Sequence, residues 1–141
     1  MLPPHLAATN IAGAALFAAL SLPSVNELSN SVFGAGAGVR CPTGATRALH
    51  TVVFLLVSLL LLLQFGRQRS AADLQTAKDM VPVALFSALL FFFLASPDVY
   101  RLTNRVLRAS ADASCPAPMH ILAHSAVFLI ISHVLSCWYL R

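Results

Sequence analysis

The fold is decided by the stretch HTVVFLLVSLLLLLQF, residues 50–65, which contains no charged side chain. A membrane-spanning α-helix needs about 17–25 mostly apolar residues, because a helix rises about 1.5 Å per residue through a hydrocarbon layer about 30 Å thick. With the two residues before it, this stretch is long enough to span. The second half of the chain carries a similar stretch, HSAVFLIISHVLSCWY, at residues 124–139. Both stretches therefore predict transmembrane helices.

Four segments in all have this length and composition. They are residues 6–22, 48–65, 80–96 and 121–140. The first could instead be a cleaved signal peptide, although no Lys or Arg precedes it. Pro82 falls in the expected first turn of the third segment, where a helix does not need its missing N–H group. The sequence therefore predicts an all-α membrane protein with four transmembrane helices.

Composition supports a single membrane domain over residues 1–141. The chain is 58% hydrophobic and 10% charged, whereas soluble domains have about 25% charged residues. The formal net charge of +4 comes from basic residues in the loops and at the C-terminus, and they do not form the basic face that nucleic-acid binding requires. They are also divided evenly between the two sides of the membrane, so they favour neither orientation. We expect the lipid bilayer, and no nucleic acid, as a partner.

The two halves of the chain match at a common offset of 74 positions, since Pro97 follows Pro23 by 74 residues. Other matching pairs are Asn30 with Asn104, Cys41 with Cys115, Pro42 with Pro116, and His50 with His124. An apolar chain matches Leu and Ala by chance, but not Pro, Asn, Cys-Pro and His at one offset. The pattern indicates a duplication, with one unit at about residues 6–66 and the other at about residues 80–140. Because each unit has an even number of spans, we expect two tandem, parallel helix-hairpin repeats.

The long loop of each unit predicts a short amphipathic helix. Pro23 ends the first span, and Val25, Leu28 and Val32 then fall on one face of a helix suited to the membrane interface. Residues 98–107 form the matching segment of the second unit.

These loops repeat more closely than membrane insertion requires. We therefore expect the loops marked by Pro23, Asn30, Pro97 and Asn104 to bind a partner protein.

His50 and His124 occupy equivalent positions at the loop ends of the second and fourth spans. Two histidines at one depth on neighbouring helices are the ligand set of a bis-imidazole haem b site. The alternative is that each imidazole hydrogen-bonds its own loop, through the side chain of Asn30 or Asn104. The other histidines of the fourth span have no counterpart in the first unit, so no metal cluster is predicted.

Cys41 and Cys115 are also equivalent, and both fall in loops on one side of the membrane. If that side is oxidising, a disulfide can tie the two units together. If it is cytosolic, the two residues are ordinary thiols. Cys137 has no counterpart and falls toward the other side.

Residues able to carry a reaction are scarce. His133 is the one ionisable side chain inside a predicted span, and the sequence has no catalytic Ser-His-Asp pattern, zinc-protease motif or phosphate-binding loop. We therefore expect a structural membrane protein without enzymatic activity or cofactor. The alternatives are a haem b anchor subunit for electron transfer and a small channel or facilitator built by a homo-oligomer.

The stretch SPDVYRLTN at residues 96–104, followed by Cys115-Pro116 and by HSAVF at residues 124–128, carries a resemblance. It resembles short hydrophobic membrane proteins of the large nucleocytoplasmic DNA viruses, including those of algae. In these proteins a helix ends in Ser-Pro, and a Leu-Thr element and a His-x-x-Val-Phe helix follow. The first unit departs from the pattern at Leu22 and Ser29.

The resemblance implies a component of a virion or virus-factory membrane beneath a capsid, with a capsid or membrane protein as partner and no catalytic residues. A subunit of an organellar membrane complex is the alternative interpretation.

Overall fold

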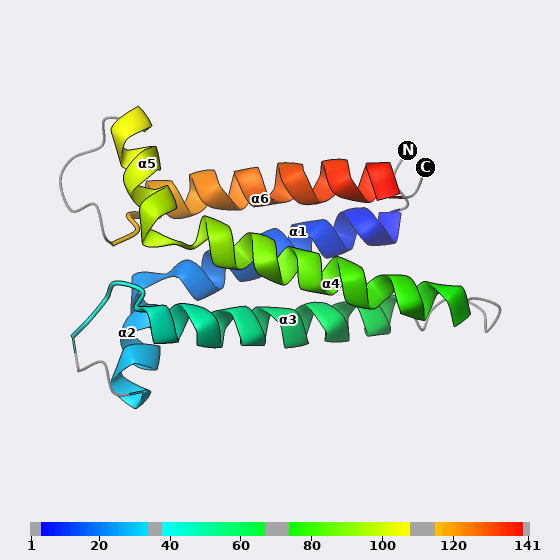
Figure 1. Ribbon diagram of the computed structural model, residues 1–141, viewed down its shortest axis with the longest axis horizontal. Helices are drawn as coiled ribbons and strands as arrows, with labels where there is room; N and C mark the ends of the chain where they lie inside the picture. The colour runs from blue at the N-terminus through cyan, green and yellow to red at the C-terminus, as the bar shows by residue number, and fades with distance from the viewer. Residues whose placement is uncertain (1–3, 34–37, 67–73, 108–114, 140–141) are drawn as a thin grey trace.

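The computed structural model describes residues 4–33, 38–66, 74–107 and 115–139, and these residues form six α-helices and no strand. The helices are α1 (Pro4–Ser21), α2 (Pro23–Val32), α3 (Gly44–Gly66), α4 (Leu74–Leu94), α5 (Pro97–Leu107) and α6 (Pro118–Tyr139). Four long helices, α1, α3, α4 and α6, run alongside one another, and α2 and α5 stand at one end of them (Figure 1). The all-helical prediction is confirmed, and each predicted span overlaps one long helix.

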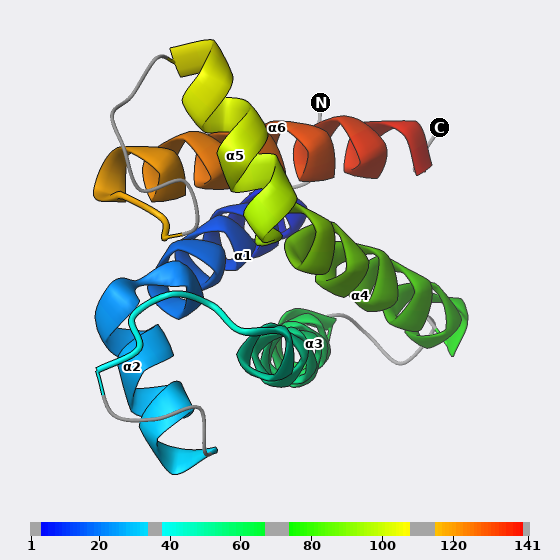
Figure 2. The same ribbon diagram turned by 60° about the vertical axis from the view of Figure 1, so that its left-hand side comes forward.

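Prolines set the breaks between the long and the short helices. Pro23 begins α2 and Pro97 begins α5, and a residue before proline is disfavoured in the helical conformation. Leu22 accordingly has an extended backbone, with φ −60° and ψ 137°. α1 and α2 are bent by 62°, and α4 and α5 by 60°. The predicted short helices are thus confirmed as helices, and they leave the bundle in different directions (Figure 2).

The long helices pair across the two halves of the chain. α3 makes its most extensive contacts with α4, and α1 makes its most extensive contacts with α6. The contacts that a hairpin within each half would need, α1 with α3 and α4 with α6, are much smaller. Neither half therefore buries its long helices mainly against itself, which differs from the separate hairpins expected from the sequence.

Four phenylalanines, one from each long helix, form the centre of the bundle: Phe17, Phe54, Phe91 and Phe128. The ring centroid of Phe17 lies 5.2 Å from that of Phe91 and 5.6 Å from that of Phe128. The ring of Phe54 lies 5.0 Å and 5.5 Å from the same two rings. At Gly13, a Cβ atom would lie 3.3 Å from the Phe128 ring, so the missing side chain lets α1 approach α6. Since each helix supplies one ring, this core needs both halves of the chain.

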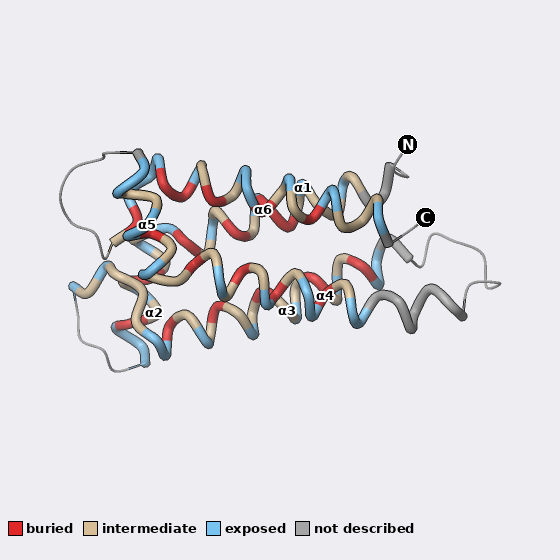
Figure 3. Tube along the Cα trace, turned by 45° about the horizontal axis from the view of Figure 1, so that its top comes forward, coloured by how far each residue is buried: buried red, intermediate tan, exposed pale blue. Residues whose placement is uncertain are grey.

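The bundle buries polar side chains and exposes apolar ones. Its buried polar residues are Ser21, Asn26, Asn30, Thr46, His50, Ser58, His120, His124 and Ser132. Large apolar residues such as Leu60, Phe93 and Ile130 are more than half exposed. The buried positions recur along the helices at intervals of about one turn (Figure 3). A water-soluble protein rarely exposes so much apolar surface, whereas lipid chains cover it without cost.

Helix length and composition agree with this burial pattern. α3 and α6 are each long and apolar enough to cross a membrane, and α1 with α2 and α4 with α5 also qualify if each bent pair is one span. The fold is therefore consistent with a membrane protein that has two to four spans.

α4 begins earlier than predicted. It starts at Leu74, so Pro82 lies inside the helix rather than in its first turn. Proline inside a helix removes one backbone donor, and membrane helices tolerate this loss better than soluble ones.

Candidate functional site

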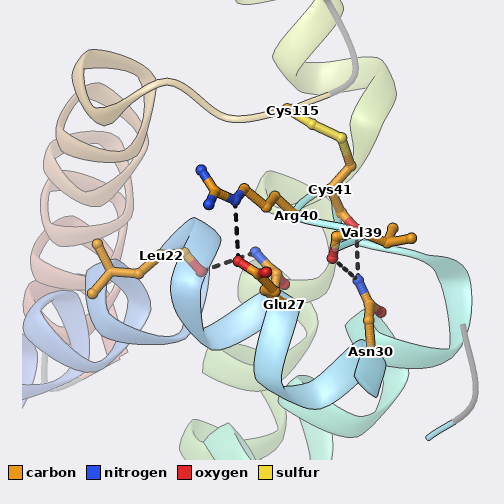
Figure 4. Close-up of polar contacts among 8 residues, drawn as sticks. Leu22, Glu27, Asn30, Val39, Arg40, Cys41 and Cys115 are labelled. Atoms are coloured by element: carbon orange, nitrogen blue, oxygen red, sulfur yellow. Dashed lines mark hydrogen bonds and ion pairs between the residues drawn. A yellow bond between two sulfur atoms is a disulfide. The ribbon is translucent and has the colours of Figure 1, made fainter. Parts of the chain in front are cut away.

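A disulfide joins the two halves of the chain at the end that carries α2 and α5. Cys41 and Cys115 form it (Figure 4), and their Cα atoms lie 4.6 Å apart, within the range that disulfides span. The sequence left a bridge and two free thiols as alternatives, and the structure contains the bridge. Cys137, in α6, is a free thiol. We call the surrounding residues 21–33, 38–50, 95–107 and 115–124 the disulfide end.

Asn30 holds the chain segment that carries Cys41. Its amide nitrogen Nδ2 donates to the backbone oxygens of Val39 at 2.7 Å and of Cys41 at 3.0 Å (Figure 4). Its oxygen Oδ1 accepts from the hydroxyl groups of Thr43 and Thr46. The side chain is 0% exposed. Asn30 therefore stabilises the loop from inside, and the expectation that it contacts a partner protein is corrected by its burial.

Replacing Asn30 by alanine is expected to lower the free energy of unfolding by about 1–2 kcal/mol, because two backbone carbonyls and two hydroxyls lose their buried partner. The measurement is SDS-driven unfolding in mixed micelles, followed by circular dichroism. Ser31→Ala on the exposed side of α2 is the control, with an expected change within about 0.5 kcal/mol. An equal effect of the two substitutions would contradict the role of Asn30.

An ion pair closes the same loop from outside. Arg40 Nε lies 3.0 Å from Glu27 Oε2, with side chains 70% and 37% exposed (Figure 4). Exposed pairs of this kind contribute about 0–1 kcal/mol, so the buried amide of Asn30 is the stronger tie.

The other predicted loop residues have different environments. Pro23 and Pro97 are half-buried at the starts of α2 and α5, where they set the bends. Asn104 is also half-buried, and its Oδ1 atom has no hydrogen-bond partner among the described residues. The structure thus places none of the four loop residues fully on the surface.

His50 and His124 make equivalent hydrogen bonds, each to a hydroxyl group of its own unit. The Ser29 hydroxyl lies 2.8 Å from His50 Nε2, and the Thr103 hydroxyl lies 2.7 Å from His124 Nε2. The backbone of Leu20 is a second partner of His50. His124 Nδ1 lies 3.1 Å from the backbone oxygen of Leu94, the residue equivalent to Leu20.

These contacts resemble the loop-bonding alternative more than the haem alternative. A histidine that ligates iron presents a free nitrogen lone pair to the metal, and both Nε2 atoms here face hydroxyl groups. Sequence reasoning placed the partners on Asn30 and Asn104, one residue too far along the chain. The signal was present, because Ser29 and Thr103 keep a hydroxyl at equivalent positions 21 residues before each histidine.

Two ring contacts orient further side chains at this end. The Tyr100 ring stacks on the His124 ring, with centroids 4.5 Å apart and planes 13° apart. The Arg47 guanidinium of α3 lies 4.3 Å from the centre of the Phe92 ring of α4. Both contacts fix polar side chains that sequence reasoning did not select.

Comparison of the chain with protein-family models, with curated proteins and with solved structures finds no match. Within the described residues, no group of three or more His, Cys, Asp and Glu side chains is placed to hold a metal ion.

Proposed function

We propose that this chain is a four-span integral membrane protein with a structural, non-enzymatic role, and that its disulfide end binds a partner protein in a virion membrane or an organellar membrane complex. α1, α3, α4 and α6 cross the bilayer in this proposal, and α2 and α5 lie at its surface. The reversed burial supports the first part, because the exposed apolar residues need lipid around them.

A tandem duplication forms part of the proposal. Its support is that contacts recur at the offset of 74 residues. Ser29 meets His50 as Thr103 meets His124, and the large interface of α1 with α6 corresponds to that of α4 with α3. Two units in the same orientation would then present α2 and α5 on the same side of the membrane.

The exposed apolar faces of α2 and α5 carry the partner-binding part of the proposal. α2 turns Asn26 and Asn30 inward, and it leaves Leu28, Val32 and Phe33 between 62% and 67% exposed. On α5, Leu102 is 60% and Val106 is 73% exposed. A helix that directs polar groups inward and apolar groups outward is stabilised when another surface covers its apolar face.

The covalent and hydrogen-bonded ties favour a protein as that surface. The Cys41–Cys115 bridge and the Asn30 bonds hold the chain around α2 in one geometry, and a pre-ordered surface loses less entropy when a partner binds. Lipid contact alone does not need such ordering.

Replacing Leu28 and Val32 together by serine, or Leu102 and Val106 together by serine, is expected to release the chain from its native complex. Loss of two half-exposed apolar side chains costs about 2 kcal/mol of contact energy, or about a thirtyfold weaker association. Native electrophoresis of membranes solubilised in mild detergent measures the size of the complex. The thermal unfolding midpoint of each variant should stay within about 2 °C of the wild type, because the four side chains are exposed.

Ser24→Ala, at an exposed position of α2, is the matched control and should leave the complex intact. Wild-type chain that migrates as a free monomer, or variants that stay in the complex, would contradict the proposal. Migration as a multiple of the chain mass would identify a homo-oligomer as the partner. Faces that contact only lipid would give variants with unchanged complexes and altered depth in the bilayer.

A further inference from the structure

A small cavity lies at the disulfide end, where residues from α1, α2, α3 and α5 meet. Pro42 and Pro116, which directly follow the bridged cysteines, form part of its wall. Its free space accommodates about one water molecule.

Four polar atoms at this cavity have no hydrogen-bond partner among the described residues. They are Ser21 Oγ, Asn26 Oδ1, Arg47 Nε and the Tyr100 hydroxyl oxygen. The side chains of Asn26 and Tyr100 are 1% exposed, and that of Ser21 is 5% exposed. The Ser21 and Tyr100 hydroxyls lie close to each other, but neither makes a hydrogen bond of normal geometry. A buried polar atom without a partner costs about 1–3 kcal/mol, so four around one cavity indicate a bound ligand.

The chemistry of the four atoms defines that ligand. Asn26 Nδ2 donates to the backbone oxygens of Ser21 at 3.4 Å and Leu22 at 3.3 Å, which leaves Oδ1 as an acceptor that needs a donor. Arg47 Nε carries a hydrogen and needs an acceptor. The ligand must therefore donate and accept at once. A chloride ion cannot donate, an ammonium ion cannot accept, and a larger molecule does not fit.

We propose that the cavity binds one structural water molecule, which donates to Asn26 Oδ1, accepts from Arg47 Nε–H and is completed by the hydroxyls of Ser21 and Tyr100. The water connects α1, α2 and α3 of the first half with α5 of the second half. It acts beside the disulfide as a second, non-covalent link between the halves.

The two halves of the sequence differ where they line this cavity. Offset by 74 residues, Ser21 corresponds to Ala95, and Asn26 corresponds to Tyr100, and all four residues line it. Arg47 corresponds to Ile121. Pro42 and Pro116, also in the wall, are identical. Divergence between the halves has thus produced one polar set around a single cavity.

The sign of a stability change distinguishes a filled cavity from a dry one. Tyr100→Phe and Ser21→Ala each remove one hydroxyl and leave the neighbouring atoms in place. If water is bound, each substitution removes a hydrogen bond, and the thermal unfolding midpoint in detergent should fall by about 3 °C. If the cavity is dry, each removes an unsatisfied buried group, and the midpoint should stay unchanged or rise. Ser132→Ala is the matched control, since Ser132 Oγ is equally buried and unpartnered but does not line the cavity; its midpoint should not fall.

Water ¹⁷O relaxation dispersion provides a direct measurement on the full-length, oxidised chain. Ser21→Val fills the free space with methyl groups, and it is expected to reduce the number of long-lived internal waters by about one relative to the wild type. Equal dispersion amplitudes in the two proteins, or midpoints that rise in both Tyr100→Phe and Ser21→Ala, would overturn the proposal.

Discussion

Replacing Cys41 and Cys115 together by serine is expected to lower the free energy of unfolding by about 2–4 kcal/mol. The bridge closes a loop of sequence separation 74, and it removes many conformations from the unfolded chain. Helices that stay inserted in a micelle already limit those conformations, which favours the lower half of the range. SDS-driven unfolding in mixed micelles measures the change, and dithiothreitol should shift the wild type to the same curve.

The free Cys137 supplies the control. Cys137→Ser leaves the bridge in place and should change the free energy by less than about 0.5 kcal/mol. A wild-type protein that responds to dithiothreitol no more than the double variant would show that the bridge contributes nothing.

Cutting the chain between the halves tests the connection itself. Residues 67–73 separate the two cysteines, so a protease site inserted there yields two fragments. They should migrate as one species on a non-reducing gel and as two on a reducing gel. Two species without reductant would contradict the bridge.

Replacing Phe91 by alanine is the second change with a large expected effect, about 2–4 kcal/mol of unfolding free energy. The Phe91 ring is 1% exposed and contacts Phe17 of α1 and Phe54 of α3, so its loss leaves a cavity where three helices meet. In lipid the transfer term is small, because the unfolded side chain also stays among apolar groups. The cost is therefore mainly lost packing.

Phe93, two residues later on α4, is the matched control. It is 64% exposed and contacts lipid in the proposed topology. Phe93→Ala should change the free energy by less than about 0.5 kcal/mol in the same assay. If the two variants are equally unstable, the phenylalanine cluster is not the centre of the bundle.

Helix positions and breaks were predictable because they depend on local sequence. Uncharged apolar runs identify α3 and α6, and Pro23 and Pro97 identify the bends. The equivalence of Cys41 and Cys115 also followed from the offset of the two units.

Helix pairing was not predictable, because helices that are apolar on most sides carry no clear face for a neighbour. The polar inner positions of α3, such as Thr46 and Ser58, are spaced by multiples of four residues, but they looked like isolated polar residues in an apolar run.

The candidate site was predicted less well than the fold. Asn30 was selected for its recurrence, and recurrence alone does not separate a buried tie from a binding residue. Its burial depends on the fold of residues 38–43, which contain no periodic pattern. The cavity was missed because its polar atoms come from positions where the two units differ, such as Arg47 and Ile121, and attention to matching positions passes over them.

The pairing of α1 with α6 and of α3 with α4 has the form of a symmetric dimer whose two subunits have been joined end to end. In a dimer of that form, each subunit supplies the partner for the other's helices, and the Cys41–Cys115 bridge is a bond between the same residue of two subunits. Fusion removes the dependence of folding on subunit concentration. It also frees the two copies to diverge, so that one symmetric interface can become an asymmetric one with a distinct role for each half.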